Sequence, residues 1–169
     1  AVNALALTAQ RPDLIRTLIA HEPPLAGILP DSDAALAACE DICQTYQRDG
    51  MGAAMAKFIA ITSYKEEFTA DYLKQPAPDP AMFGLPTTDD GSRDDALLGQ
   101  NLRGCASYQP DFDAIAKASD RIVLAVGEDS AGELANRGGL AAAGRLGLTP
   151  VVFPSNHGGF LGDEYGFPG

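Results

Sequence analysis

The pattern of apolar and polar positions changes twice along the chain and divides it into three segments. Residues 1–10 are rich in Ala, Leu and Val and stop at Arg11-Pro12-Asp13, which is typical of a buried helix. Residues 14–20 (LIRTLIA) are short, β-branched and apolar, and the prolines of HEPP follow them. We therefore expect a helix and then a strand in the first segment, residues 1–24.

The middle segment, residues 25–118, has the spacing of helices. Apolar residues recur every three or four positions from Ser32 to about Ser63, and glycines at 50 and 52 divide this run into two helices. After a proline-rich link, Ser92-Arg-Asp-Asp95 has the form of a capping box and predicts a helix that begins at Ser92. Residues 111–118 predict one more short helix.

The last segment, residues 119–169, returns to strands. Arg121–Val126 and Pro150–Phe153 are short apolar runs, and between them a helical pattern opens at Ser130 and continues to about Arg145. A strand, a helix and a strand in so few residues form a βαβ unit, which requires parallel pairing. The predicted fold class is therefore α/β, with residues 25–118 inserted as a helical cap.

Charge and composition narrow the classes of partner. The 169 residues suit one domain, and a net charge of −11 repels nucleic acid and anionic membranes. No apolar run is long enough to span a bilayer and the first residues lack a signal peptide, so we expect a cytoplasmic protein. The three cysteines show no zinc spacing and are interpreted as buried thiols. We expect a small-molecule substrate, no metal, no cofactor, and possible homodimerisation.

The candidate chemistry lies at strand ends. His157 follows the last predicted strand in PSNHGGF, where a neutral imidazole is able to take and return a proton; the alternative is a histidine that only stabilises its own loop. Its carboxylate partner is either Asp129, beside Glu128 in the Gly127-Glu-Asp-Ser loop, or Glu22 in HEPP. His21 is expected to point away from Glu22, because neighbouring strand residues face opposite sides.

A substrate pocket is expected under the helical cap. Phe58, Tyr64 and Phe160 are its candidate lining residues, although most aromatic side chains of the cap are expected to pack against one another. The sequence contains no Gly-x-Ser-x-Gly, no dinucleotide-binding or phosphate-binding glycine loop and no metal cluster. A base is thus present without a recognisable nucleophile.

The order of elements, together with the stretches VAVGEDS and NHGGF, resembles the C-terminal part of an α/β-hydrolase. In that family a nucleophile elbow is followed by a small-residue helix like Ala1–Ala6, which ends in a phrase like Gln10-Arg-Pro-Asp13. The resemblance implies a chain truncated at both ends, with its nucleophile just before Ala1. The family's usual acid position holds Ser130 here, and some members take the acid from the end of the earlier strand, where Glu22 lies.

The function implied by this resemblance is hydrolysis of an ester or a similar acyl bond, without a cofactor. His157 would be the general base, and Asp129 or Glu22 would orient it. The fold also carries dehalogenases, epoxide hydrolases and cofactor-free haloperoxidases. The alternative from another class is a non-catalytic protein that binds a small ligand or a partner on the same scaffold.

Overall fold

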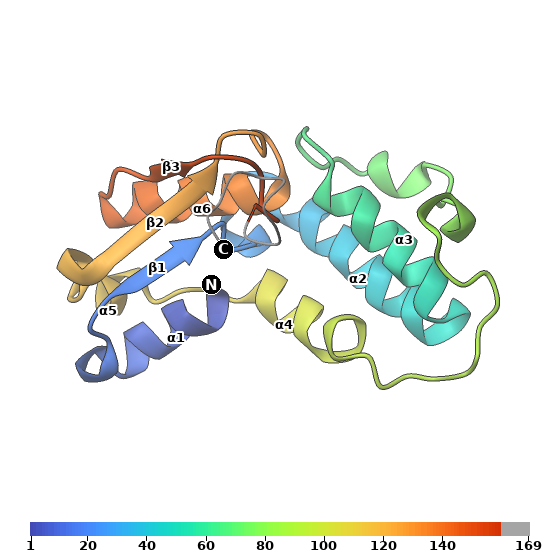
Figure 1. Ribbon diagram of the computed structural model, residues 1–169, viewed down its shortest axis with the longest axis horizontal. Coiled ribbons are helices and arrows are strands. Elements are labelled where there is room, and N and C mark those ends of the chain that lie inside the picture. Colours follow the sequence, from blue (N-terminus) through green and yellow to red (C-terminus); the bar gives the residue numbers. More distant parts are fainter. Residues whose placement is uncertain (160–169) are drawn as a thin grey trace.

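Three short parallel strands form the centre of one part of the molecule (Figure 1). The computed structural model describes residues 1–159. Strands β1 (Leu18–His21), β2 (Ile122–Gly127) and β3 (Val151–Phe153) lie in the order β1-β2-β3. His21 pairs with Ala125, and Gly127 with Phe153, so the carboxyl ends of all three strands meet at one edge of the sheet. The mixed α/β class and the parallel pairing are confirmed.

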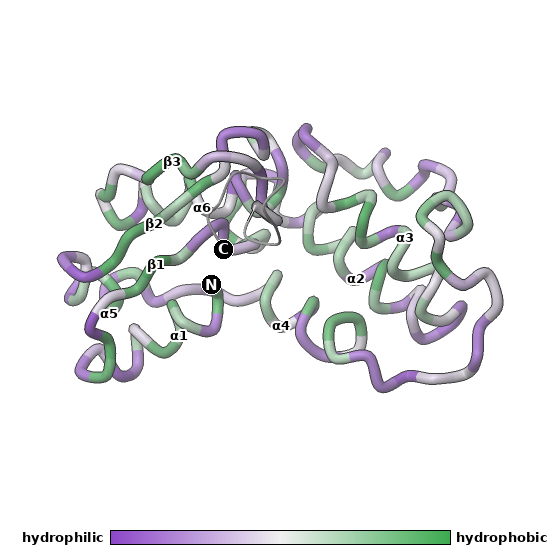
Figure 2. The backbone as a smooth tube through the Cα atoms, viewed as in Figure 1, coloured by the Kyte–Doolittle hydropathy of each residue, from purple (hydrophilic) through white to green (hydrophobic). Residues whose placement is uncertain are grey.

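Helices α1 (Val2–Gln10), α5 (Phe112–Ala116) and α6 (Leu134–Leu146) cover one face of this sheet. The core between them is apolar and consists mainly of Leu5, Leu18, Ala20, Ile115, Ile122, Leu124 and Ala142. Alternate strand residues point to the opposite face, where Ile19 is 58% exposed. Figure 2 shows the hydrophobic residues running along β1 and β2.

A second core forms between the helices of the middle segment. Helices α2 (Ser32–Asp49) and α3 (Met51–Thr62) pack on each other, and a π-helical turn (Leu97–Asn101) leads into α4 (Leu102–Ser107), which packs on α2. Its centre contains Ile42, Tyr46, Ile61 and Leu98. Gly50 ends α2 and begins α3 with φ +87°, a conformation that glycine adopts without steric cost. The predicted division at this point is confirmed.

The predicted starts of three elements are wrong, and side-chain hydrogen bonds explain each. No helix begins at Ser92, because its hydroxyl and amide both bind Asp90 Oδ1, whereas Asp95 Oδ1 accepts the amide of Leu98 (2.8 Å). Helix α6 begins at Leu134 because the Ser130 hydroxyl binds Glu22 instead of capping a helix. Residues 12–14 form a 3₁₀ turn, so β1 begins at Leu18.

Helix α5 lies with the sheet although its residues belong to the segment expected as the cap. Ile115 is fully buried in the core shared with α1 and α6. Among the helices of residues 1–159, none combines the length and the apolar character that crossing a membrane requires.

Candidate active site

Glu22 lies at the carboxyl end of β1 with its side chain completely buried. Its amide donates to the carbonyl of Ala125 (2.9 Å), which continues the pairing of β1 with β2 by one residue. The backbone then turns, with φ +43°, an uncommon conformation for a residue with a side chain. Strain of this kind is retained where the surroundings fix a side chain, and is frequent at functional sites.

Three donors hold one carboxylate oxygen of Glu22. Oε1 accepts from the amide of Gly127 (2.8 Å), from the amide group of Asn136 (3.2 Å) and from the hydroxyl of Ser130. A Cβ at Gly127 would lie 2.6 Å from the carbonyl oxygen of Ser155, so only glycine allows these loops to meet here. The other oxygen, Oε2, is left for a partner on the opposite side.

That partner is His157. Its Nδ1 lies 3.0 Å from Glu22 Oε2, and its side chain is 55% exposed whereas that of Glu22 is fully buried. The loop that carries His157 is fixed by Asn156, which accepts from the amides of Gly158 (2.9 Å) and Gly159 (3.0 Å). Ser155 has φ +68°; Glu22 and Ser155 are the two non-glycine residues with positive φ in residues 1–159. Both therefore adjoin the Glu22–His157 contact.

The surroundings of Glu22 stabilise its charged form. Burial raises the pKa of this carboxyl, but hydrogen bonds from His157, Ser130, Gly127 and Asn136 outweigh burial and lower the pKa to about 2. At neutral pH the group is therefore a carboxylate. With Nδ1 engaged by that carboxylate, Nε2 is the nitrogen of His157 that remains to exchange a proton with a reactant.

His21 lies closer to the site than the sequence predicts. Its ring stacks between those of Phe153 (centroids 5.8 Å apart) and His157 (5.7 Å), and its Nε2 lies 3.9 Å from Glu22 Oε2. The expected opposite orientation is wrong because the backbone turn at Glu22 breaks the strand alternation. Burial lowers the pKa of His21, only partly opposed by the charge of Glu22, so the ring is neutral near pH 7.

One group of potential metal ligands exists among residues 1–159 at this edge of the sheet. His21, Glu22 and His157 offer three ligand atoms within 4.8 Å of one another. Two imidazoles and a carboxylate suit Zn²⁺. An ion there would have to replace the hydrogen bond between Glu22 and His157.

The competing acid, Asp129, is exposed in the loop after β2, as is its neighbour Glu128. The backbone of Asp129 is well held, since its amide donates to Ser155 (3.1 Å) and its carbonyl accepts from Lys65 (3.0 Å). Within the described part of the chain, no hydrogen bond or ion pair joins its carboxylate to His157. The structure thus brings Glu22 to His157 and leaves Asp129 in solvent.

A cavity of about 570 Å³ opens beside His157, between the helices of the middle segment and the start of α6. Phe58, one of the candidate lining residues, is among the residues of its wall. Tyr64 is not among its lining residues and packs instead with Phe68 (ring centroids 5.0 Å apart) and Tyr72 (4.9 Å). Phe160 lies outside the described residues. The volume is that of a site for a small molecule.

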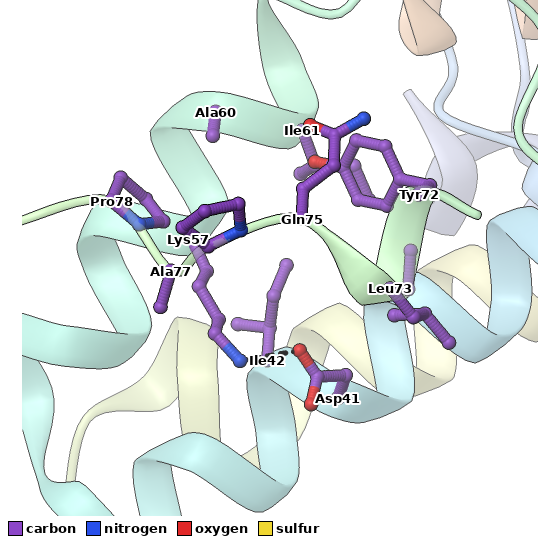
Figure 3. Close-up of a pocket in the computed structure, with 12 residues that line it drawn as sticks. Asp41, Ile42, Lys57, Ala60, Ile61, Tyr72, Leu73, Gln75, Ala77 and Pro78 are labelled. Carbon is purple, nitrogen blue, oxygen red and sulfur yellow. Dashed lines mark hydrogen bonds and ion pairs between the residues drawn. The ribbon is translucent and has the colours of Figure 1, made fainter.

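A smaller hollow of about 210 Å³ is lined by residues of α2, of α3 and of the segment 72–78 (Figure 3). Lys57 and Asp41 form an ion pair (2.6 Å) in its wall, and Tyr72 and Gln75 also line it. Neither histidine lines this hollow. We do not connect it with the chemistry at the sheet edge.

No protein family, curated protein or solved structure matches this chain. Function is therefore inferred from the site itself.

Ser130 and Asn136 belong to the site although sequence reasoning missed their role. Both side chains are buried, and each donates to Glu22 Oε1. Asn136 lies in α6, where a polar side chain on the inner face of the helix was the available signal. A buried polar group requires a partner, and here the partner is a carboxylate more than 100 positions earlier.

Proposed function

We propose that this chain carries the acid and the base of an α/β-hydrolase that cleaves an ester or a similar acyl bond. The observation that supports the proposal most strongly is the contact of Nδ1 of His157 with Glu22 Oε2 at 3.0 Å. A buried carboxylate, an exposed imidazole and an adjoining cavity are the arrangement that general-base catalysis needs.

In this mechanism Glu22 fixes the tautomer of His157. The carboxylate accepts a hydrogen bond from the protonated Nδ1, so Nε2 has a free lone pair. Nε2 takes the proton of a nucleophilic hydroxyl as that oxygen attacks the acyl carbon, and then returns the proton to the leaving group. Glu22 stabilises the imidazolium between these two steps.

The position of Ala1 is consistent with a nucleophile that precedes it in the intact protein. Helix α1 runs alongside β1, and the N-terminus lies at the same side of the molecule as the carboxyl end of that strand (Figure 1). A residue just before Ala1 would thus approach the sheet edge where His157 lies. In the hydrolase proposal the residues 25–107 form the cap over the site.

Ester turnover by the intact protein tests this proposal. With a neutral p-nitrophenyl ester, H157A and E22Q are each expected to lower kcat by about 10³- to 10⁴-fold, because the base loses its function or its tautomer. Asp129→Asn is the matched control: it removes a carboxylate from the neighbouring loop and is expected to keep kcat within about threefold. Loss of turnover in D129N but not in E22Q would overturn the assignment of the acid.

Unchanged ester turnover by a folded H157A protein would show that His157 is not the general base. A wild-type protein that binds small ligands but hydrolyses no ester would favour the non-catalytic alternative.

A further inference from the structure

The cavity beside His157 has a mostly apolar wall, with one carboxylate among residues 1–159. Its interior is formed by apolar side chains, chiefly Phe58, Ile61, Leu97, Leu102, Ala106 and Leu134. At the side of α6 it is lined by Glu133, and at the side of the histidine loop by Asn156 and His157. A ligand that enters therefore places its apolar part among the helices and its polar part beside a carboxylate.

Glu133 is the residue that provides this carboxylate, and little solvent surrounds its side chain. Its side chain is 16% exposed and forms an ion pair with Lys65, whose Nζ lies 3.7 Å from Glu133 Oε1. Burial raises the pKa of Glu133, and the charge of Glu22 acts in the same direction, whereas Lys65 and His157 oppose them. The interaction with both Glu22 and His157 places Glu133 within the electrostatic range of the reacting groups.

Lys65 offsets the charge of Glu133 only from outside the cavity, because it is not among the residues that line it. Its Nζ already donates to the carbonyl of Asp129 (3.0 Å) and faces Glu133 itself. No lysine or arginine lines the cavity among residues 1–159. An anionic ligand would thus lose its hydration and meet a carboxylate, without a lysine or arginine in the cavity wall to pair with.

We propose that this cavity binds uncharged, apolar acyl groups and rejects carboxylates, with Glu133 as the residue that determines this specificity. The assignment of the bound group as the acyl part of a substrate rests on the proposed hydrolase function. The binding preference itself does not. Medium-chain esters and amides are the class that this cavity fits, and fatty-acid anions of equal length are the class that it excludes.

Calorimetric titration of the chain with octanamide and with octanoate at pH 8 tests the preference, since the two ligands differ mainly in charge. Octanamide is expected to bind at least about tenfold more tightly. Glu133→Gln is expected to reduce that ratio to about threefold or less. Glu128→Gln removes an exposed carboxylate nearby and is expected to leave the ratio unchanged.

Two substitutions that fill the cavity test whether octanamide binds inside it. Ala106→Phe places a ring in the cavity and is expected to abolish octanamide binding. If A106F does not fold, Ser63→Phe replaces it in the test: this substitution narrows the cavity from an exposed position and is expected to weaken binding. Octanoate binding equal to or tighter than octanamide binding would overturn the proposal. So would the absence of octanamide binding to the folded wild-type chain.

The outcome is separable from that of the hydrolase proposal. Octanamide binding and ester turnover are both measured on the wild-type protein, because binding depends on the cavity whereas turnover also depends on Glu22 and His157. Retained selective binding without ester turnover would count against the hydrolase function alone. Turnover of esters with equal binding of both ligands would count against the role of Glu133 alone.

Discussion

Glu22 is the residue around which the site is organised, and its charge depends on the groups that contact it. A buried carboxylate without partners would be neutral or would destabilise the fold. Here Gly127, Ser130, Asn136 and His157 supply hydrogen bonds from three different loops or helices. The same contacts that orient His157 therefore also contribute to the stability of the folded chain.

This contribution predicts a specific dependence on pH. The pKa of Glu22 falls from 4.5 to about 2 on folding, so its stabilisation is fully present above pH 4.5 and is lost as the pH decreases toward 2. The shift corresponds to roughly 3 kcal/mol. Urea unfolding at a series of pH values should show that the free energy of unfolding of wild type falls more steeply in this window than that of E22Q.

Asp129→Asn controls for the loss of one negative charge, and its curve should follow that of wild type. Parallel curves for wild type and E22Q would show that Glu22 is not stabilised as a carboxylate.

The sequence was sufficient to place the candidate site but not to choose its members. His157, Glu22 and Asp129 all follow predicted strands, and parallel strands bring their carboxyl ends to one edge. The choice between the two acids depends on the turn at Glu22 and on donors distant in sequence. Local sequence patterns reveal neither this turn nor these distant donors. The positions of Ser130 and Asn136 beside Glu22 are likewise defined only once the chain has folded.

At the scale of elements, α6 controls the position of Glu22. It contributes Asn136, and its two central glycines let the helix approach the residues after β1. A Cβ at Gly138 would lie 2.3 Å from the carbonyl oxygen of Pro23 and 2.8 Å from the amide of Leu25. Gly144, in the same helix, has no atom within 4 Å of such a Cβ.

Substitution by alanine is predicted to have opposite effects at Gly138 and at Gly144. Gly138→Ala should lower the free energy of unfolding by about 1–3 kcal/mol and reduce ester turnover, because the backbone after Glu22 must move. Gly144→Ala should raise stability by roughly 0.5–1 kcal/mol, because alanine favours a helix, and should leave turnover unchanged. Chemical denaturation and initial rates measure both. Equal effects of the two substitutions would contradict the close packing of α6.

Predicted elements agree with the structure where apolar periodicity is long, as in α2 and α3. They fail at boundaries decided by a single side chain. Ser92 and Asp95 are both suitable helix caps in sequence, and only the hydrogen bonds of Ser92 with Asp90 decide between them.

At the scale of the whole molecule, a buried ion pair joins the helical segment to the sheet. Asp31, just before α2, contacts Arg137 of α6, and their side chains are 6% and 15% exposed. Asp31 also accepts from the amide of Phe68 (2.6 Å), and Arg137 donates to the carbonyl of Glu66 (3.3 Å). The start of α2 and the chain after α3 are thus fixed to the helix that holds Glu22.

Removing the arginine tests this link. Arg137→Leu leaves Asp31 buried without its ion-pair partner and should lower the free energy of unfolding by roughly 3 kcal/mol. Arg103→Leu breaks an exposed pair with Glu40 (2.7 Å; side chains 59% and 40% exposed) and should cost less than about 1 kcal/mol. Similar losses in both variants, measured by urea unfolding, would show that the Asp31–Arg137 pair does not join the two parts.

The most direct test of the central claim, that Glu22 and His157 form the acid and base of a hydrolase, is the rate at which a fluorophosphonate probe labels the intact protein. Intact-mass spectrometry follows the reaction. The account predicts one adduct, formed at similar rates in wild type and D129N and at least about a hundredfold more slowly in E22Q and H157A. No adduct on wild type, or labelling that is as fast in H157A as in wild type, would contradict it.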